Sequence, residues 1–237
     1  MERPTRRDAS KPAAASAVLF VLLAIASAAQ PVKPRTPGPW EPLFDGKSTA
    51  GWRGWRQQAM PDGWTVVDGA LTRGGKSGDI VSLREFADFE LEVEWKIAPK
   101  ANSGLFYRVV EHPDDPDMWM VAPEYQIIDD AGYPAPLKPT QKTAANYDLQ
   151  PPGVDATKPA GEWNTTRIVA DGAHVEHWLN GQRIVAYELW TADWSRLVAA
   201  SKFKDHPRYA RAKSGRIGIQ DHGDWIAFRT IRIRTLE

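Results

Sequence analysis

The 237-residue sequence contains no cysteine. This absence excludes disulfide bonds, thiolate metal sites, a cysteine nucleophile and a lipid-modified N-terminal cysteine. The chain also lacks an excess of charge, because 30 Lys and Arg residues balance 30 Asp and Glu residues. Without a basic excess, nucleic acid is not expected as a partner.

Helical periodicity and several well-known motifs are scarce or missing. Only residues 192–200 predict a short helix, with Thr191 as its N-cap. No glycine-rich phosphate loop, Gly-x-Ser-x-Gly elbow or His-Glu-x-x-His pair occurs. The sequence therefore gives no support to phosphate-loop enzymes, elbow-type serine hydrolases or zinc proteases of that motif.

Residues 1–29 have the features of an export signal. A basic start with Arg6 and Arg7 precedes the apolar run 13–26, and small residues at 26–29 offer cleavage sites. The run is shorter than the ~20 residues of a membrane span, which favours a cleaved signal over an anchor and predicts no stable membrane insertion afterwards. The arginine pair leaves both Sec and twin-arginine export open. Residues 30–39 are proline-rich and predict a linker, and the location is expected to be periplasmic or otherwise extracytoplasmic.

The stretch Phe89–Ile97 alternates between apolar and charged residues. A period of two predicts a β-strand with one apolar and one charged face. The charged face carries Glu90, Glu92, Glu94 and Lys96, so it is either a solvated surface or the floor of a polar groove. The chain also has 11 Trp residues, and aromatic side chains beside a polar sheet face are a common way to hold sugars.

Turn signals divide the rest of the chain into short strands. Asp68-Gly69, Asp171-Gly172 and Asn180-Gly181 each predict a hairpin between two apolar runs. The segments 111–123 and 130–159 are proline-rich and lack periodicity, as functional or mobile loops do. The pattern predicts an all-β fold over residues 40–237, a single domain made of a sandwich of two antiparallel sheets.

An ordered set of sequence blocks covers roughly residues 43–234. The blocks are Leu43-Phe44-Asp45-Gly46-Lys47-Ser48, Gly51-Trp52, Phe89-Glu90-Leu91-Glu92-Val93-Glu94-Trp95-Lys96, Asn102-Ser103-Gly104-Leu105-Phe106-Tyr107-Arg108, Glu124-Tyr125-Gln126-Ile127-Ile128-Asp129, Tyr147-Asp148-Leu149, Pro159-Ala160-Gly161-Glu162-Trp163-Asn164, His177-Trp178-Leu179-Asn180-Gly181, Ser201-Lys202-Phe203 and Gly215-Arg216-Ile217-Gly218-Ile219-Gln220-Asp221-His222-Gly223. This set resembles the 3-keto-disaccharide hydrolase domain family. Each block is unspecific alone, whereas their order is specific.

The resemblance implies a concanavalin A-like jelly roll and action on sugars oxidised at C3. A C3 ketone acidifies the C2 proton, so its removal gives an enolate that can expel the C1 substituent, and water then adds to the enone. Such a reaction needs a base at C2, an electrophile for the enolate oxygen and an acid for the leaving oxygen. We therefore expect an exported hydrolase or lyase-like enzyme that cleaves 3-keto-glycosides, with a small carbohydrate as its partner.

Four residues are candidates for the catalytic group. Glu124 is the candidate base or acid, with a solvated edge strand as the alternative interpretation. His222 lies where a strand runs into a loop. Arg108 shares its predicted face with Phe106, where it could bind an enolate or pair with Glu92 or Glu94 across strands. His177 falls on an apolar face, where a core histidine is the competing interpretation.

Six further residues are candidates for holding the sugar. Gln126 shares the face of Glu124 by strand parity, and Trp119 lies on a proline-rich loop that suits stacking against a sugar ring. The remaining four are Gln220, Asp79, Lys96 and Asn102. Asp79 and Asn102 could instead be turn residues, and Lys96 could instead be structural.

No metal site or cofactor is predicted from the motifs. The acidic residues Glu111, Asp114, Asp115 and Asp117 could hold Ca²⁺ through oxygen ligands, but their spacing lacks the full loop signature and favours solvated acids. Two other functions compete with the enzyme. One is a non-catalytic carbohydrate-binding module of the cell envelope, and the other is a structural surface domain. The oligomeric state is left open.

Overall fold

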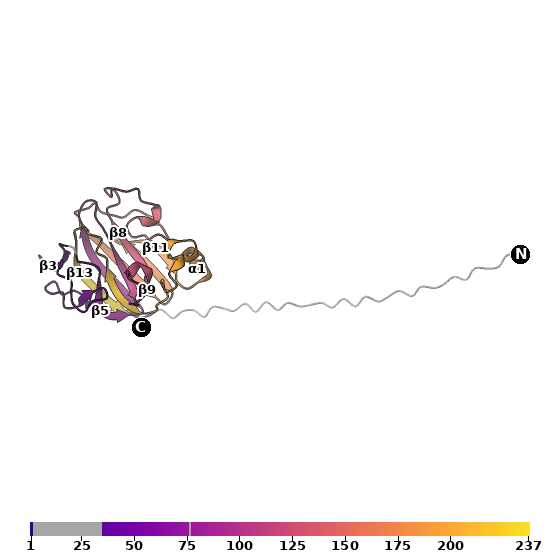
Figure 1. The fold of residues 1–237 in the computed structure, drawn as a ribbon, viewed down its shortest axis with the longest axis horizontal. Coiled ribbons are helices and arrows are strands. Elements are labelled where there is room, and N and C mark those ends of the chain that lie inside the picture. Colours follow the sequence, from indigo (N-terminus) through magenta and orange to yellow (C-terminus); the bar gives the residue numbers. More distant parts are fainter. Residues whose placement is uncertain (2–34, 76) are drawn as a thin grey trace. The chain divides into compact units, whose positions relative to one another are not determined.

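The computed structural model describes Met1 and residues 35–75 and 77–237. The predicted signal at 1–29 and most of the linker at 30–39 lie outside the described residues. Figure 1 shows strands of two layers with little helix. Among the helices of the described part, none has the length and apolar character that a membrane span requires.

Two antiparallel sheets form the sandwich, as predicted. The larger sheet has the order β11-β10-β9-β6-β13-β4-β3, with β1 beside β13. Its strands are β1 (Glu41–Pro42), β3 (Trp64–Val67), β4 (Ala70–Arg73), β6 (Phe89–Ile97), β9 (Asn164–Asp171), β10 (His174–Leu179), β11 (Gln182–Glu188) and β13 (Ile226–Thr235). The smaller sheet has the order β2-β5-β12-β7-β8. Its strands are β2 (Trp52–Gly54), β5 (Ile80–Phe86), β7 (Asn102–Val109), β8 (Glu124–Ile128) and β12 (Gly215–Ile219).

The predicted hairpins have the backbone geometry that their residues favour. Asp68 and Gly69 have φ of 49° and 75°, and Asn180 and Gly181 have φ of 49° and 82°. Two successive positive φ values give the type I′ turn that matches the twist of the flanking strands. These turns join β3 to β4 and β10 to β11 in the larger sheet.

The helical elements are short and lie between strands. Helix α1 (Ala192–Ala199) follows β11, and the Thr191 hydroxyl caps it by accepting a hydrogen bond from the Trp194 N–H at 3.1 Å, which confirms the predicted N-cap. Three 3₁₀ turns complete the list: η1 (Met118–Met120), η2 (Pro139–Gln141) and η3 (Lys202–Asp205).

The core lies between the two sheets. Alternate residues of β6, including Leu91 and Trp95, are fully buried there. The Trp95 indole N–H donates to the Thr166 hydroxyl at 2.8 Å, so its one polar atom is satisfied inside the core. Trp163 is only partly buried, and the Arg229 guanidinium lies over its ring on the outer face.

The charged face of β6 is a solvated outer surface. Glu94 pairs with Arg229 at 3.0 Å and Glu92 pairs with Arg232 at 2.5 Å across the β6–β13 ladder. The Lys96 ammonium lies 4.9 Å from the centre of the Trp163 ring on the same face. Partly exposed ion pairs of this kind contribute at most ~1 kcal/mol each, and the carboxylates of this face pair with arginines of β13.

Candidate functional site

The outer face of the smaller sheet carries a row of polar side chains around a glycine. Gly104 of β7 pairs with Gln126 of β8, and its carbonyl accepts a hydrogen bond from the Gln220 N–H at 3.0 Å. Ile80 pairs with Ile219, which places Asp79 beside Gln220 at the next strand. A row across four neighbouring strands is therefore formed by Asp79, Gln220, Gly104 and Gln126. Glu124 lies two residues before Gln126 on the same face of β8.

Gly104 leaves the space that the Glu124 carboxylate occupies. A Cβ atom added at Gly104 would lie 2.3 Å from Glu124 Oε1, far inside van der Waals contact. The carboxylate thus lies directly over the backbone of β7. Any larger residue at this position would displace it.

The Glu124 side chain is buried without a hydrogen-bonding partner. The residue is 5% exposed, and no described residue donates a hydrogen bond to its carboxylate. Burial raises the pKa of Glu124 because desolvation penalises the charged form. The Lys202 ammonium acts in the opposite direction, and the Asp79 carboxylate adds to the rise. With its pKa raised to about 8, the Glu124 carboxyl holds its proton in most molecules at neutral pH, and its ionised fraction is a strong base.

Loops form the wall beside this carboxylate. The Tyr147 N–H donates to the Glu124 carbonyl at 3.0 Å, which ties the loop after η2 to the edge strand β8. The Lys202 ammonium of η3 lies 4.4 Å from the Tyr147 ring centre, 4.9 Å from that of Trp119 and 5.1 Å from that of Phe203. The ammonium is therefore held by cation–π contacts from three separate segments.

The other end of the row holds Asp79. Its Oδ1 accepts a hydrogen bond from the Asp221 N–H at 2.8 Å. Burial raises the pKa of Asp79 to about 6, and the neighbouring Asp221 and Asp117 carboxylates add to the rise. A carboxyl of this kind is partly protonated near neutral pH and can donate a proton.

Two amide oxygens in this region lack a hydrogen-bonding partner among the described residues. They are Asn102 Oδ1 and Gln220 Oε1, and both are buried. Unpaired buried acceptors are uncommon because they cost free energy, and hydroxyl groups of a bound ligand would satisfy them. Gln126 is partly engaged, since its Nε2 donates to the Gln141 carbonyl at 3.4 Å.

Several residues expected at the site lie together here. Glu124, Gln126, Gln220 and Asp79 are on the outer face of the smaller sheet, and Asn102 follows on the same face by strand parity. Trp119 joins them through Lys202, with its ring also 4.8 Å from that of His206. Their roles toward substrate stay predictions.

His222 lies beyond the row, in the loop after β12. Its ring is exposed, and its Nδ1 is 3.9 Å from Asp224 Oδ2. The neighbouring Asp221 backbone holds Asp79, so His222 is at the rim rather than beside Glu124. Its catalytic role stays a prediction.

The expected position of Arg108 is wrong. A positive φ of 55° interrupts the strand alternation at this residue. The buried guanidinium donates three hydrogen bonds at one end of the sandwich. The acceptors are the Ala87 carbonyl at 2.9 Å, the Gly172 carbonyl at 2.8 Å and Asp88 Oδ1 at 3.0 Å. Arg108 therefore secures this end of the fold and does not face the row.

His177 and Lys96 are also away from the row. His177 is fully buried between the sheets, where its Nδ1 lies 3.0 Å from the Ala144 carbonyl and its Nε2 lies 3.0 Å from the Tyr107 hydroxyl. Burial lowers its pKa to about 4, so it is a neutral core histidine. Lys96 lies on the outer face of the larger sheet, which is the opposite layer of the sandwich.

Lys202 is the residue that sequence reasoning missed. It belongs to the Ser201-Lys202-Phe203 block, but nothing local distinguishes this lysine from others in the chain. Its position near Glu124 depends on tertiary contacts with the rings of Trp119 and Tyr147.

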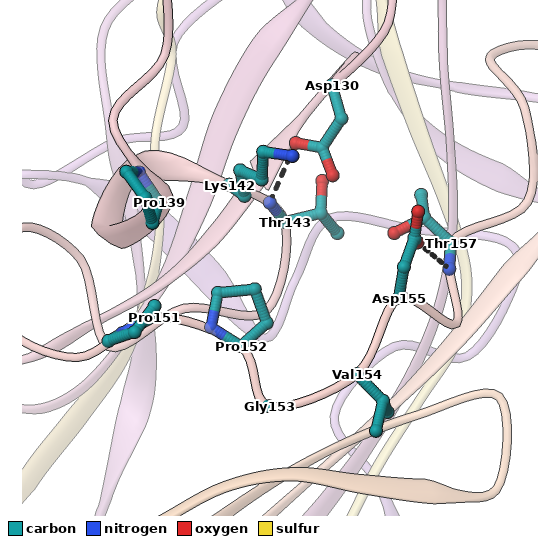
Figure 2. Close-up of a pocket in the computed structure, with 10 residues that line it drawn as sticks. All are labelled: Asp130, Pro139, Lys142, Thr143, Pro151, Pro152, Gly153, Val154, Asp155 and Thr157. Carbon is teal, nitrogen blue, oxygen red and sulfur yellow. Dashed lines mark hydrogen bonds between the residues drawn. The ribbon is translucent and has the colours of Figure 1, made fainter.

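A separate hollow of about 240 Å³ lies within the loop 130–159. Figure 2 shows Asp130, whose Oδ1 accepts from the Thr143 N–H at 2.9 Å, and Asp155, whose Oδ1 accepts from the Thr157 N–H at 3.0 Å. Three prolines, Pro139, Pro151 and Pro152, also line the hollow, together with Lys142, Gly153 and Val154. Glu124 does not line it, so the hollow is distinct from the row.

Within residues 35–75 and 77–237, no three His, Asp or Glu side chains gather closely enough to hold a metal ion. In the acidic loop, Glu111 pairs with Arg53 at 2.7 Å and Asp115 pairs with Arg208 at 2.5 Å.

The two antiparallel sheets form a concanavalin A-like jelly-roll sandwich, with a polar row on the outer face of the smaller sheet. Residues 39–234 match the 3-keto-alpha-glucoside-1,2-lyase-like domain, and the chain belongs to this family. The family resemblance and the sandwich inferred from sequence are thereby confirmed, and the chain is an enzyme of the glycoside-cleaving class.

Named relatives agree with this placement. The chain is 35% identical over 226 residues to a 3-keto-disaccharide hydrolase of Bacteroides thetaiotaomicron, covering 82% of this chain and 78% of the relative. A crystal structure from Parabacteroides distasonis, assigned provisionally as a glycosyl hydrolase, has a TM-score of 0.80 and 33% identity, covering 84% of this chain and 94% of that chain. A non-specific endo-beta-1,3(4)-glucanase has a TM-score of 0.52 at 12% identity, covering 86% of this chain and 96% of that one, and shares the fold alone.

Proposed function

We propose that this enzyme cleaves the glycosidic bond of 3-keto-glycosides by elimination followed by hydration. The observation that carries the proposal is the Glu124 carboxylate, which is buried, free of hydrogen bonds and directly over Gly104. Family membership and the name of the Bacteroides relative support the substrate class. The unpaired oxygens of Asn102 and Gln220 support a ligand rich in hydroxyl groups.

Glu124 acts as the base in the first step through its ionised fraction, which the Lys202 ammonium favours. Its carboxylate takes the C2 proton, and the electron pair of the C–H bond moves to form the enolate at C3. The enolate then returns its electrons and expels the C1 oxygen, which leaves a C1=C2 double bond conjugated to the ketone. A well-placed base contributes ~10²–10⁴-fold to such a step.

Asp79 supplies the proton for the leaving oxygen. Its pKa of about 6 leaves a protonated fraction near neutral pH, and the Asp221 N–H fixes its orientation. Water then adds its hydroxide to C1 while protonated Glu124 returns a proton to C2, and the remaining proton of the water restores Asp79. The sum is hydrolysis, and release of the enone before hydration makes the same site a lyase.

The proposal also includes the cell compartment. The basic and apolar pattern of residues 1–29 supports export, and a mature domain beginning near residue 40 acts outside the cytoplasm. Comparing the N-terminus of protein recovered from the periplasm with that of the cytoplasmic precursor tests this part directly.

Glu124→Gln tests the catalytic proposal. The substitution keeps the side-chain volume but removes the base, so we expect release of sugar from a 3-keto-disaccharide to fall by ~10²–10⁴-fold with an unchanged melting temperature. Glu92→Gln is the matched control, because Glu92 lies on the outer face of the larger sheet, and its rate should equal that of the wild type.

Two outcomes would overturn the proposal. Full turnover by Glu124→Gln would place the base elsewhere. Binding of the 3-keto-sugar by wild-type protein without any cleavage would make the chain a carbohydrate-binding module.

A further inference from the structure

The Lys202 ammonium has aromatic neighbours but no anionic or hydrogen-bonding partner. Among the described residues, no oxygen accepts a hydrogen bond from its Nζ, and no carboxylate forms an ion pair with it. Asp148, which acts on it from a distance, is instead 4.0 Å from Lys138 Nζ. The residue is exposed, so a ligand can reach the ammonium.

The ammonium also lies in the field of Glu124. Each group is the leading charge acting on the other, yet they do not touch. A cation and a carboxylate that lie near one another without pairing can bind two atoms of one ligand. Three rings from η1, η3 and the loop after η2 restrict where the ammonium can point.

We propose that Lys202 is the electrophile that binds the C3 oxygen of the substrate, and that it selects the ketone over the alcohol. This inference rests on the proposed function and assigns the one role that the proposed function leaves open. The C3 oxygen gains negative charge as Glu124 removes the C2 proton, so an ammonium at that oxygen stabilises the enolate more than the ground state. The ammonium keeps its protons throughout, and no covalent bond forms.

The selectivity follows from the same contact. A 3-hydroxy sugar has no acidic C2 proton and develops no charge at O3, so its binding to the site is unproductive. Fixed donors at a developing oxyanion are worth ~10²–10³-fold in rate. Replacing Lys202 by Met keeps an unbranched apolar stem against the three rings and removes only the charge.

The enolisation step can be isolated from cleavage. A 3-keto sugar without a C1 leaving group, 1,5-anhydro-3-keto-glucitol, can lose its C2 proton but cannot eliminate the missing substituent. We would follow exchange of that proton with D₂O by NMR in wild type, Lys202→Met, Lys202→Arg and Glu124→Gln. Lys204→Met is the matched control, because Lys204 lies on the same 3₁₀ turn and is exposed.

We expect Lys202→Met to slow exchange by ~10²–10³-fold, Lys202→Arg to restore part of the rate, and Lys204→Met to match the wild type. Equal exchange in Lys202→Met and wild type, with both proteins folded by circular dichroism, would overturn the inference while leaving Glu124 as base. Reduction by borohydride that attached the sugar to Lys202 would also overturn it, because it would show an imine. No exchange or cleavage in the wild type would instead refute the proposed function.

Discussion

The substitution Asp79→Asn isolates the contribution of one site carboxyl to the pH dependence of the free energy of unfolding. The folded pKa of Asp79 is about 6 against an ordinary value of 3.8. Because the folded pKa is the higher one, the folded state holds the proton more tightly. The corresponding stability is fully present below pH 3.8 and is lost as the pH rises through 6.

The size of the effect follows from the two pKa values. Their difference, at ~1.36 kcal/mol per pKa unit, corresponds to about 3 kcal/mol. Asparagine keeps an oxygen that can accept the Asp221 N–H but cannot ionise. The free energy of unfolding of Asp79→Asn, relative to the wild type, should therefore increase by about 3 kcal/mol between pH 2 and pH 8, most of it between pH 4 and pH 6.

Urea unfolding at half-unit pH intervals measures this difference. Asp221→Asn provides a control of opposite sign, since N–H donors of Gly78, Gly223 and Ser77 and the cation of Arg73 lower the pKa of Asp221 despite its burial. That variant should lose stability relative to the wild type as the pH rises. Parallel curves for wild type and Asp79→Asn would refute the assignment of the raised pKa to Asp79.

Two other substitutions test the floor of the site and the core. Gly104→Ala should lower the cleavage rate at least tenfold because its Cβ displaces the Glu124 carboxylate, whereas Gly74→Ala, which meets no atom within 4 Å, should not; equal rates in both variants would contradict the geometry. The wild type should lose about 3 kcal/mol of unfolding free energy as the pH falls from 6.5 to 4, because buried His177 has a folded pKa of about 4 and resists protonation. His177→Gln cannot be protonated, so it should not show this loss. Urea unfolding at pH values from 4 to 7 checks this, and equal pH dependence in wild type and His177→Gln would contradict it.

Local sequence signals were sufficient for most of the framework. The Asn180-Gly181 pair can adopt two positive φ values, and Thr191 can cap a helix through its own hydroxyl, so both features follow from neighbouring residues. Strand parity also placed Glu124 and Gln126 on one face, because β8 is regular and has no bulge. These inferences depend only on short stretches of chain.

The remaining features depend on contacts between distant segments or on departures from regularity. Arg108 turns out of its expected face because its φ is positive, which strand alternation does not reveal. Lys202 lies near Glu124, without contacting it, only because η3 packs against the loop that contains Tyr147. The alternation in Phe89–Ile97 predicted the strand, but the arginines that neutralise its carboxylates come from β13.

The ion-paired outer face of the larger sheet is suited to chemical labelling. It lies on the layer opposite the row of Glu124, and the chain has no cysteine of its own. A single thiol introduced there would react uniquely with a fluorophore or a solid support. The immobilised or labelled enzyme would keep the row that contains Glu124 accessible to solution.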